Sequence, residues 1–78
     1  MDANMAALLR AAGDVLGRYD LELTPETSIM SVDGWDSLVL ANIILLLESQ
    51  LGVVFDTYDV AGIKTVGDII KMMEKAQN

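Results

Sequence analysis

The sequence predicts an all-α domain, a small four-helix bundle with a long first loop and a short third helix. Three observations favour this fold class. Apolar residues make up 53% of the 78-residue chain but aromatic residues only 5%, and such aliphatic side chains favour helices over a sandwich. Apolar residues recur at helical spacing in three segments. Size scaling gives a folded surface of roughly 4,600 Å², so residues 1–78 can form only one domain with a thin core.

The first helix is predicted from apolar residues at i, i+3, i+4 and i+7 spacing, which run from Met5 to Tyr19. Asp2 is a candidate N-cap. Gly13 lies within the pattern and lowers helix propensity by about 1 kcal/mol relative to Ala. We therefore expect packing to hold this helix in place.

A long connection follows, from Asp20 to Asp36, where the helical spacing lapses. Thr24-Pro25 and Asp33-Gly34 are turn signals. Connections in compact domains are usually about 4 to 6 residues long, and longer ones are often functional. We expect this loop to be ordered, with apolar anchors at Leu21, Leu23, Ile29 and Val32.

A second helix is predicted to begin at Asp36 or Ser37 and to end at Gly52, because Gly is the preferred residue just past a helix C-terminus. Leu38 and Leu45 lie opposite its core face, so the helix has more apolar surface than one buried side requires. Either both residues pack in a core that surrounds the helix, or they contact another protein. The expected core face consists of Leu40, Ile43, Ile44, Leu47 and Leu51.

The last third of the chain contains two more cap signals. Asp56 is a candidate cap for a short helix through Val60. The segment before it, residues 53–55, could form a strand, but a lone strand has nothing to pair with. Thr65 and Asp68 match a capping box at the start of a final helix.

Composition excludes several function classes. A net charge of -7 disfavours nucleic-acid binding. The chain has no Cys and no His, which removes disulfides, thiolate zinc sites and the usual general base. We expect no catalytic residue, no metal site and no enzymatic activity. Residues 1–4 lack the basic start of a signal peptide, and the apolar run from Leu38 to Leu47 is about half of a membrane span. We expect a cytoplasmic monomer without membrane insertion.

Ser37 is the candidate for chemistry. It lies in Gly34-Trp35-Asp36-Ser37-Leu38, where the long loop meets the second helix. A phosphate attached there would be favoured by the free backbone N–H groups and the positive end of the helix dipole. The alternative is that Asp36-Ser37 is only an N-cap.

Four short sequence motifs, taken in order, distinguish an attachment site at Ser37 from a plain N-cap. They are Gly34-Trp35-Asp36-Ser37-Leu38, Leu47-Glu48, Gly52-Val53-Val54-Phe55-Asp56 and Thr65-Val66-Gly67-Asp68. With this order and spacing over nearly the whole chain, the sequence resembles the acyl carrier protein family, which includes peptidyl and aminoacyl carriers.

The resemblance implies a single carrier domain with 4'-phosphopantetheine on Ser37, transferred from coenzyme A by a separate Mg²⁺-dependent phosphopantetheinyl transferase. The arm would hold acyl or aminoacyl groups as thioesters. Asp36 would cap the helix and help to orient the transferase. Other partners would be a loading ligase or acyltransferase and the synthase enzymes of fatty-acid-like, polyketide, nonribosomal peptide or other specialised biosynthesis.

The second helix departs from the acidic pattern of carriers in bacterial fatty acid synthesis. Glu48 is its only acid, so the recognition face is expected to be more apolar than the net charge suggests. The candidate partner contacts are Trp35, Leu38, Val39, Asn42, Leu45 and Glu48. Trp35 is a loop anchor in the alternative interpretation.

Two further hypotheses stay open. The protein could instead be an unmodified acidic helical module that docks through its second helix. Cargo could also enter a cavity between the second and final helices, with walls from Ala41, Leu46, Leu47, Ile63 and Ile70, or the core could simply be filled.

Overall fold

The computed structural model describes residues 2–78; Met1, the first residue of the N-terminal segment considered above, lies outside them. The elements are α1 (Ala3–Leu16), the 3-10 turn η1 (Ile29–Ser31), α2 (Ser37–Leu51), α3 (Thr57–Ala61) and α4 (Val66–Gln77). Within residues 2–78 the only β-type pairing is one isolated bridge, between Ser28 and Thr65. The predicted all-α architecture with four helices is confirmed.

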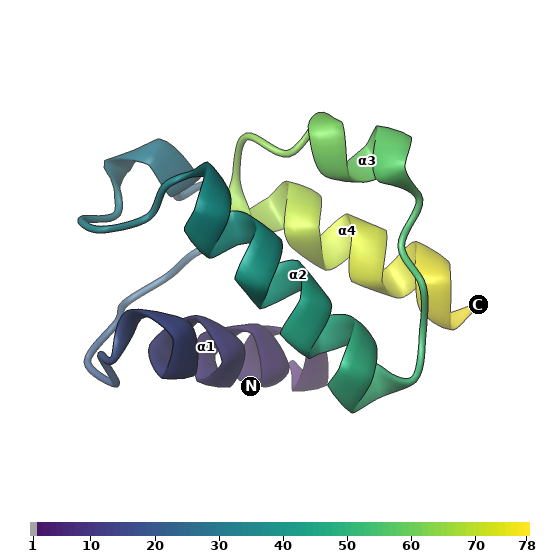
Figure 1. Cartoon of the computed structure of the whole chain (residues 1–78), viewed down its shortest axis with the longest axis horizontal. Coiled ribbons are helices and arrows are strands. Elements are labelled where there is room, and N and C mark those ends of the chain that lie inside the picture. Colours follow the sequence, from purple (N-terminus) through teal and green to yellow (C-terminus); the bar gives the residue numbers. More distant parts are fainter. Residues whose placement is uncertain (1) are drawn as a thin grey trace.

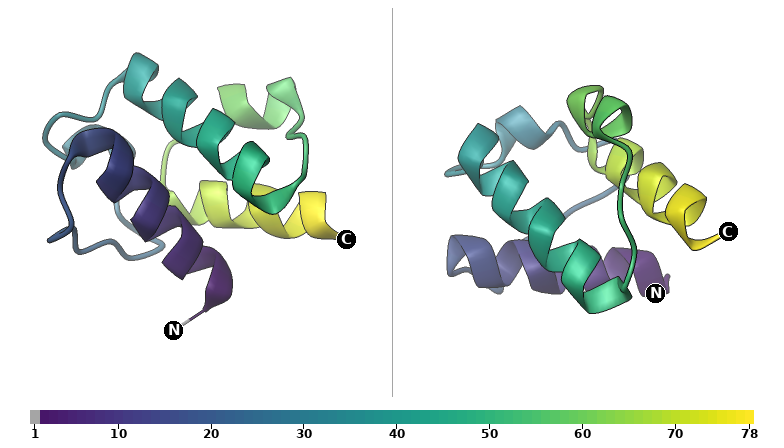
Figure 2. Two further views of the ribbon diagram at one scale, coloured as in Figure 1. Left: turned by 60° about the horizontal axis from the view of Figure 1, so that its bottom comes forward. Right: turned by 45° about the vertical axis from the view of Figure 1, so that its right-hand side comes forward.

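The helices enclose one core. In Figure 1, α2 crosses diagonally in front, α1 lies below it and α3 lies along the upper side of α4. The two rotated views in Figure 2 show the same arrangement, with α1 packed on both α2 and α4. The accessible surface is 4820 Å², close to the expectation from chain length. The largest fully buried side chains are Leu8, Ile43, Leu47, Val66, Ile69 and Met73.

Local caps set the helix boundaries. The Asp36 side chain accepts a hydrogen bond from the backbone N–H of Val39 at 2.8 Å, and Asp56 accepts one from Tyr58 N–H at 2.7 Å. Gly52 ends α2 with a φ of 67°, in the left-handed region that favours Gly. These three predicted boundaries are confirmed. Asp2 stands at the N-cap position of α1, but its side chain makes no capping bond.

The predicted extent of the first helix needs correction. The helix ends at Leu16, where Gly17 takes a φ of 69°, so Tyr19 lies outside it and is 78% exposed. The Tyr19 hydroxyl donates to Asp14 at 2.8 Å, and this negative partner raises the pKa of the phenol. The apolar spacing continued through Tyr19, but the chain had already turned at Gly17.

The long loop is ordered by contacts with the start of α4. Ile29 N–H donates to the Lys64 carbonyl at 3.1 Å, Val66 N–H to the Thr27 carbonyl at 2.9 Å, and Gly67 N–H to the Pro25 carbonyl at 2.8 Å. Ile29 is buried, whereas Leu21, Leu23 and Val32 pack half-buried against the core. The four predicted anchors are therefore confirmed. We call this set of loop–α4 backbone bonds the loop stitch.

The segments that follow α2 match the predictions made for them. Residues 53–55 form no strand, and Phe55 is buried in the core. Thr65 and Asp68 form the predicted capping box at the start of α4. None of the helices in residues 2–78 combines the length and the apolar character that a membrane crossing requires.

Candidate functional site

Ser37 is the first residue of α2 and is exposed. The N-cap is Asp36, whose backbone is extended and whose carboxylate binds Val39 N–H. The Ser37 hydroxyl is thus not needed as a cap. Its position at the positive end of a 15-residue helix suits an attached phosphodiester.

Trp35 fixes the loop just before this serine. The ring is 4% exposed and belongs to the hydrophobic core, and the backbone N–H donates to the Val32 carbonyl at 3.1 Å. Trp35 is therefore a loop anchor, and its burial does not support the prediction that it contacts a partner. Its indole Nε1 is buried without a hydrogen-bond partner in residues 2–78. An unpaired buried donor of this kind costs about 1–3 kcal/mol.

A pocket of about 320 Å³ adjoins Ser37. It lies between η1, the first turns of α2 and the segment from α3 to Ile63, and Trp35, Asp36 and Ser37 line one side. Its other walls are apolar: Ile29, Met30, Leu40, Ala41, Val60, Ala61 and Ile63.

This position corrects the predicted cavity between the second and final helices. Ala41 and Ile63 do line the pocket, but Leu46, Leu47 and Ile70 do not. Leu47 is fully buried, because the space behind α2 is filled by core side chains. Helical spacing predicts which face of its helix each of these residues occupies. It does not predict which neighbouring element packs against that face.

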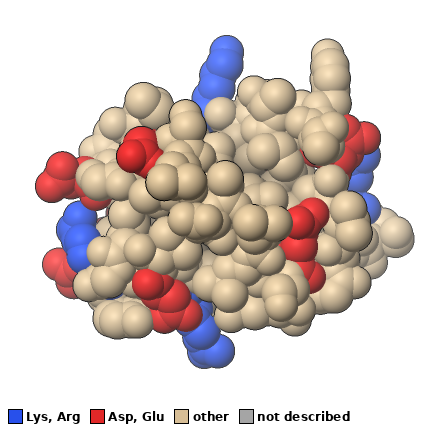
Figure 3. Space-filling view, in the orientation of Figure 1, with Lys and Arg blue, Asp and Glu red and all other residues tan. Residues whose placement is uncertain are grey.

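The outer face of α2 is apolar and free of charge. Leu38 is 70% and Leu45 63% exposed, so the interpretation that they pack in the core is wrong. Asn42 is exposed beside them, and Val39 is half-buried. Figure 3 shows an uncharged band across the middle of the molecule, over α2. We call Leu38, Val39, Asn42 and Leu45 the α2 face.

Glu48 has a structural role at the other end of the helix. Its carboxylate accepts a hydrogen bond from Phe55 N–H at 2.7 Å, in a partly buried position. The bond holds the α2–α3 connection against the helix. This placement does not favour Glu48 as a partner contact, and the α2 face therefore contains no acid.

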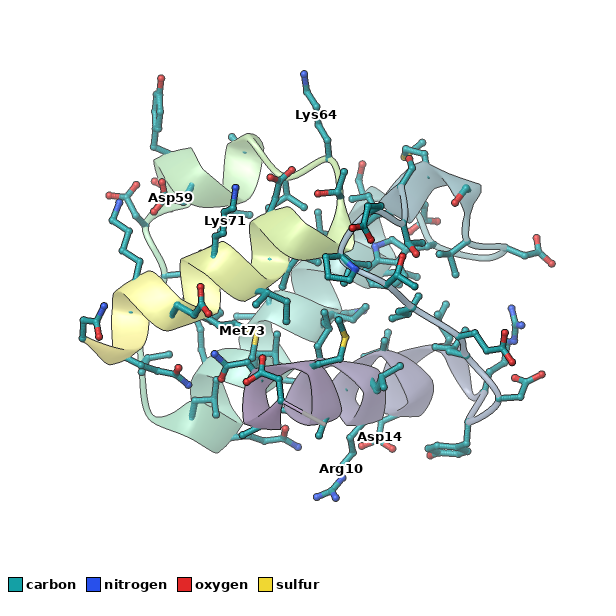
Figure 4. The ribbon with its side chains drawn as sticks, turned by 180° about the vertical axis from the view of Figure 1, so that it is seen from behind. Arg10, Asp14, Asp59, Lys64, Lys71 and Met73 are labelled. Carbon is teal, nitrogen blue, oxygen red and sulfur yellow. The ribbon has the colours of Figure 1, made fainter. Side chains whose placement is uncertain are left out.

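The lysines are grouped in the C-terminal part of the chain. All three lysines lie within residues 64–75, and Figure 4 shows Lys64 and Lys71 projecting outward on the side of α3 and α4. Lys75 pairs with Asp59 at 3.0 Å, which raises the pKa of the lysine. Across residues 2–78, Asp, Glu, His and Cys side chains form no group of three that could hold a metal ion.

Comparisons with known proteins agree with this geometry. Residues 6–73 match the family model described as "Phosphopantetheine attachment site". The meromycolate extension acyl carrier protein of Mycolicibacterium aurum is 33% identical over 73 residues, which cover 94% of this chain and 75% of that protein. The acyl carrier protein of Thermotoga maritima is 38% identical over 60 residues, or 77% of this chain and 74% of its own length.

A solved structure shows the same fold. The holo acyl carrier protein from Geobacter metallireducens superposes with a TM-score of 0.86 at 30% sequence identity, covering 97% of this chain and 87% of that one. The family model also covers the segment that holds Ser37, the α2 face and the pocket. The chain therefore belongs to the acyl carrier protein family: it is a non-catalytic carrier of acyl groups in biosynthesis, and it works with a covalently attached 4'-phosphopantetheine.

Proposed function

We propose that Ser37 is the attachment point of 4'-phosphopantetheine and that the protein is itself the substrate of a phosphopantetheinyl transferase. The observation that carries this proposal is the exposed hydroxyl at the start of α2, next to a helix cap that Asp36 already provides. Of the side chains around the pocket, only Ser37 carries a hydroxyl group.

Transfer of phosphopantetheine to Ser37 would be a substitution at phosphorus. A bond forms between Ser37 Oγ and the phosphorus that carries the pantetheine in coenzyme A. The bond from that phosphorus to the bridging oxygen breaks, and adenosine 3',5'-bisphosphate leaves. In this proposal the hydroxyl proton passes to a base of the transferase.

The residues around Ser37 fit the group. The phosphodiester carries a negative charge, and α2 presents backbone N–H groups and the positive end of its dipole at this point. Asp36 holds the first turn in shape through Val39 N–H, and we propose that it also helps to orient the transferase and its metal ion. When bound, the arm supplies a terminal thiol that carries cargo as a thioester.

We further propose that partner enzymes read the α2 face. These would be a loading ligase or acyltransferase and the downstream synthase enzymes of a specialised pathway. Leu38 and Leu45 supply exposed apolar area, and no charged residue lies between Ser37 and Leu47. Such a surface favours apolar complementarity over electrostatic steering. The protein is proposed to act as a monomer.

Intact-protein mass spectrometry tests the attachment site. Incubation with coenzyme A, Mg²⁺ and a broad-specificity transferase should raise the mass by one phosphopantetheine group. The gain should be lost in Ser37→Ala and kept in Ser49→Ala, an exposed serine on the same helix. Circular dichroism would show that both variants remain folded.

The competing hypothesis of an unmodified docking module gives the opposite results. It predicts no mass gain for the wild type with any of several transferases, and full function of Ser37→Ala in the native cell. A mass gain that persists in Ser37→Ala would also contradict the proposed site, since it would place the group on another residue.

A further inference from the structure

The buried indole N–H of Trp35 is a polar group without a structural use. Trp35 is the only tryptophan of the chain, and Nε1 has no hydrogen-bond partner in the part of the chain that the structure describes. Buried polar groups in native proteins are nearly always bonded, so an exception calls for a physical reason. A phenylalanine would anchor the loop through the same kind of ring and would bury no donor.

Trp35 also lines the pocket beside Ser37. The rest of the wall is largely aliphatic, including Ile29, Leu40, Val60 and Ile63. Ligand pockets have this character: mostly apolar walls and a few polar groups that fix the orientation of the ligand. The pocket volume of about 320 Å³ is near the lower end of the range of about 300–1,000 Å³ for such sites.

The indole makes no hydrogen bond to the carboxylate of Asp36, the next residue in the chain. The Asp36 carboxylate is exposed and is bonded to Val39 N–H. The loop that leads to Trp35 is tied to the start of α4 by the loop stitch. Met30 is 77% exposed at the same pocket. Because Nε1 itself has almost no accessible surface, cargo can reach it only if a lining side chain such as Met30 moves or the indole turns.

We infer that Trp35 is a specificity residue whose Nε1–H donates a hydrogen bond to an oxygen on the acyl chain of the cargo. The preferred cargo is then a short acyl group with a carbonyl or hydroxyl oxygen on its chain, rather than a plain alkyl chain. This inference rests on the proposed function, because the cargo reaches the pocket from the arm on Ser37. An oxygen-bearing cargo gains a partner for the buried donor, whereas an alkyl cargo leaves it unpaired.

The test compares two cargoes that differ by one carbonyl. Wild-type protein is loaded with hexanoyl or 3-oxohexanoyl groups from the corresponding coenzyme A thioesters, and ¹H–¹⁵N spectra are recorded. With a single tryptophan there is one indole signal to follow. The indole proton should move downfield in the 3-oxo form and stay near its position in the unloaded carrier in the hexanoyl form. Its exchange with solvent should slow about tenfold in the 3-oxo form, equivalent to about 1.4 kcal/mol.

Trp35→Phe removes the donor and keeps an aromatic ring. The 3-oxo carbon, labelled with ¹³C, should have a different chemical shift on Trp35→Phe than on the wild type, and the same shift as the wild type on Tyr19→Phe, an exposed aromatic outside the pocket. If Trp35→Phe does not fold, the comparison of the two cargoes on wild-type protein decides alone.

The outcomes separate this inference from the proposed function. No mass gain on loading would overturn the attachment to Ser37. A mass gain at Ser37 with the same indole shift for both cargoes, or with a shift already present in the unloaded holo form, would overturn only the role of Trp35.

Discussion

Gly13 is enclosed by the chain that turns back over the end of α1. Arg18 N–H donates to the Gly13 carbonyl at 2.9 Å. A Cβ on Gly13 would lie 2.7 Å from the Arg18 carbonyl oxygen and 2.9 Å from the Tyr19 ring, closer than real Cβ atoms come. The backbone oxygen cannot easily move, so only Gly fits at this position. The tight turn therefore requires a residue of low helix propensity inside α1.

We therefore expect Gly13→Ala to destabilise the protein, although helix propensity alone predicts a gain of about 1 kcal/mol. The clash should outweigh that gain and leave a net loss of about 1–2 kcal/mol in the free energy of unfolding. Urea unfolding followed by circular dichroism measures this. Ala6→Gly, at an exposed position of the same helix, is the reference for propensity and should cost about 0.5–1 kcal/mol. A Gly13→Ala protein more stable than wild type would contradict the steric argument.

Among the elements, α4 has the most complete N-terminal cap. Asp68 N–H donates to Thr65 Oγ1 at 3.2 Å, while the Asp68 carboxylate accepts from the backbone N–H groups of Thr65 at 3.0 Å and Lys64 at 2.9 Å. The bonds from Lys64 and Thr65 lower the pKa of Asp68 below its usual value of 3.8. Replacing a Thr N-cap by Ala costs about 0.5–2 kcal/mol in other helices.

The lowered pKa of Asp68 makes its contribution to stability depend on pH. Because the carboxylate is favoured in the folded state, its contribution is complete above 3.8, the ordinary pKa, and is lost as the pH falls through the lower folded value. Asp68→Asn should thus be less stable than wild type at neutral pH, and the difference should shrink in acid. Thermal unfolding from neutral pH down to about pH 2 measures it.

Glu74→Gln, which removes an exposed acid from the same helix, is the control for net charge. If its stability difference from wild type followed the same course with pH as that of Asp68→Asn, the effect would come from overall charge, and the role of the capping box would be refuted.

At the scale of the whole molecule, net charge and the charge of the α2 face differ. The chain carries -7 overall, yet residues 37–47 contain no charged side chain, and Figure 3 shows an uncharged band over α2. Leu38 and Leu45 each leave well over half of their surface in water. If partners dock here, apolar area rather than charge sets the affinity.

A docking prediction follows for the transferase reaction. Leu45→Ser should lower kcat/KM for modification of Ser37 about tenfold, which corresponds to about 1.4 kcal/mol. Val54→Ser, which changes an equally apolar side chain that is 87% exposed outside the α2 face, should leave it unchanged. The wild-type rate should fall little as NaCl rises from about 0.05 M to about 0.5 M, a range in which exposed charges become strongly screened. A steep salt dependence together with an unaffected Leu45→Ser protein would contradict apolar docking.

Sequence-based prediction succeeded where the cause is local. The caps at Asp36, Asp56 and Thr65 and the end at Gly52 depend on neighbouring residues, so their signals are readable in the chain itself. The exposure of Leu38 and Leu45 and the position of the pocket depend on which elements meet in space, and helical spacing does not encode that. The loop stitch could not be predicted for the same reason. Its hydrogen bonds join backbone groups, so no particular side chain in the sequence indicates them.

The loop stitch has a consequence for motion. Three backbone hydrogen bonds join residues 25–29 to residues 64–67. The long loop therefore cannot detach from the core without breaking its bonds to the first turn of α4. We therefore expect loop and helix to open as one cooperative unit, in which the N–H groups of Ile29 and Val66 exchange with solvent at the same slow rate. If the prosthetic group is attached at Ser37, as we propose, the reach of the carrier comes from the arm itself, because the loop that leads to this serine is tied to α4 by these bonds.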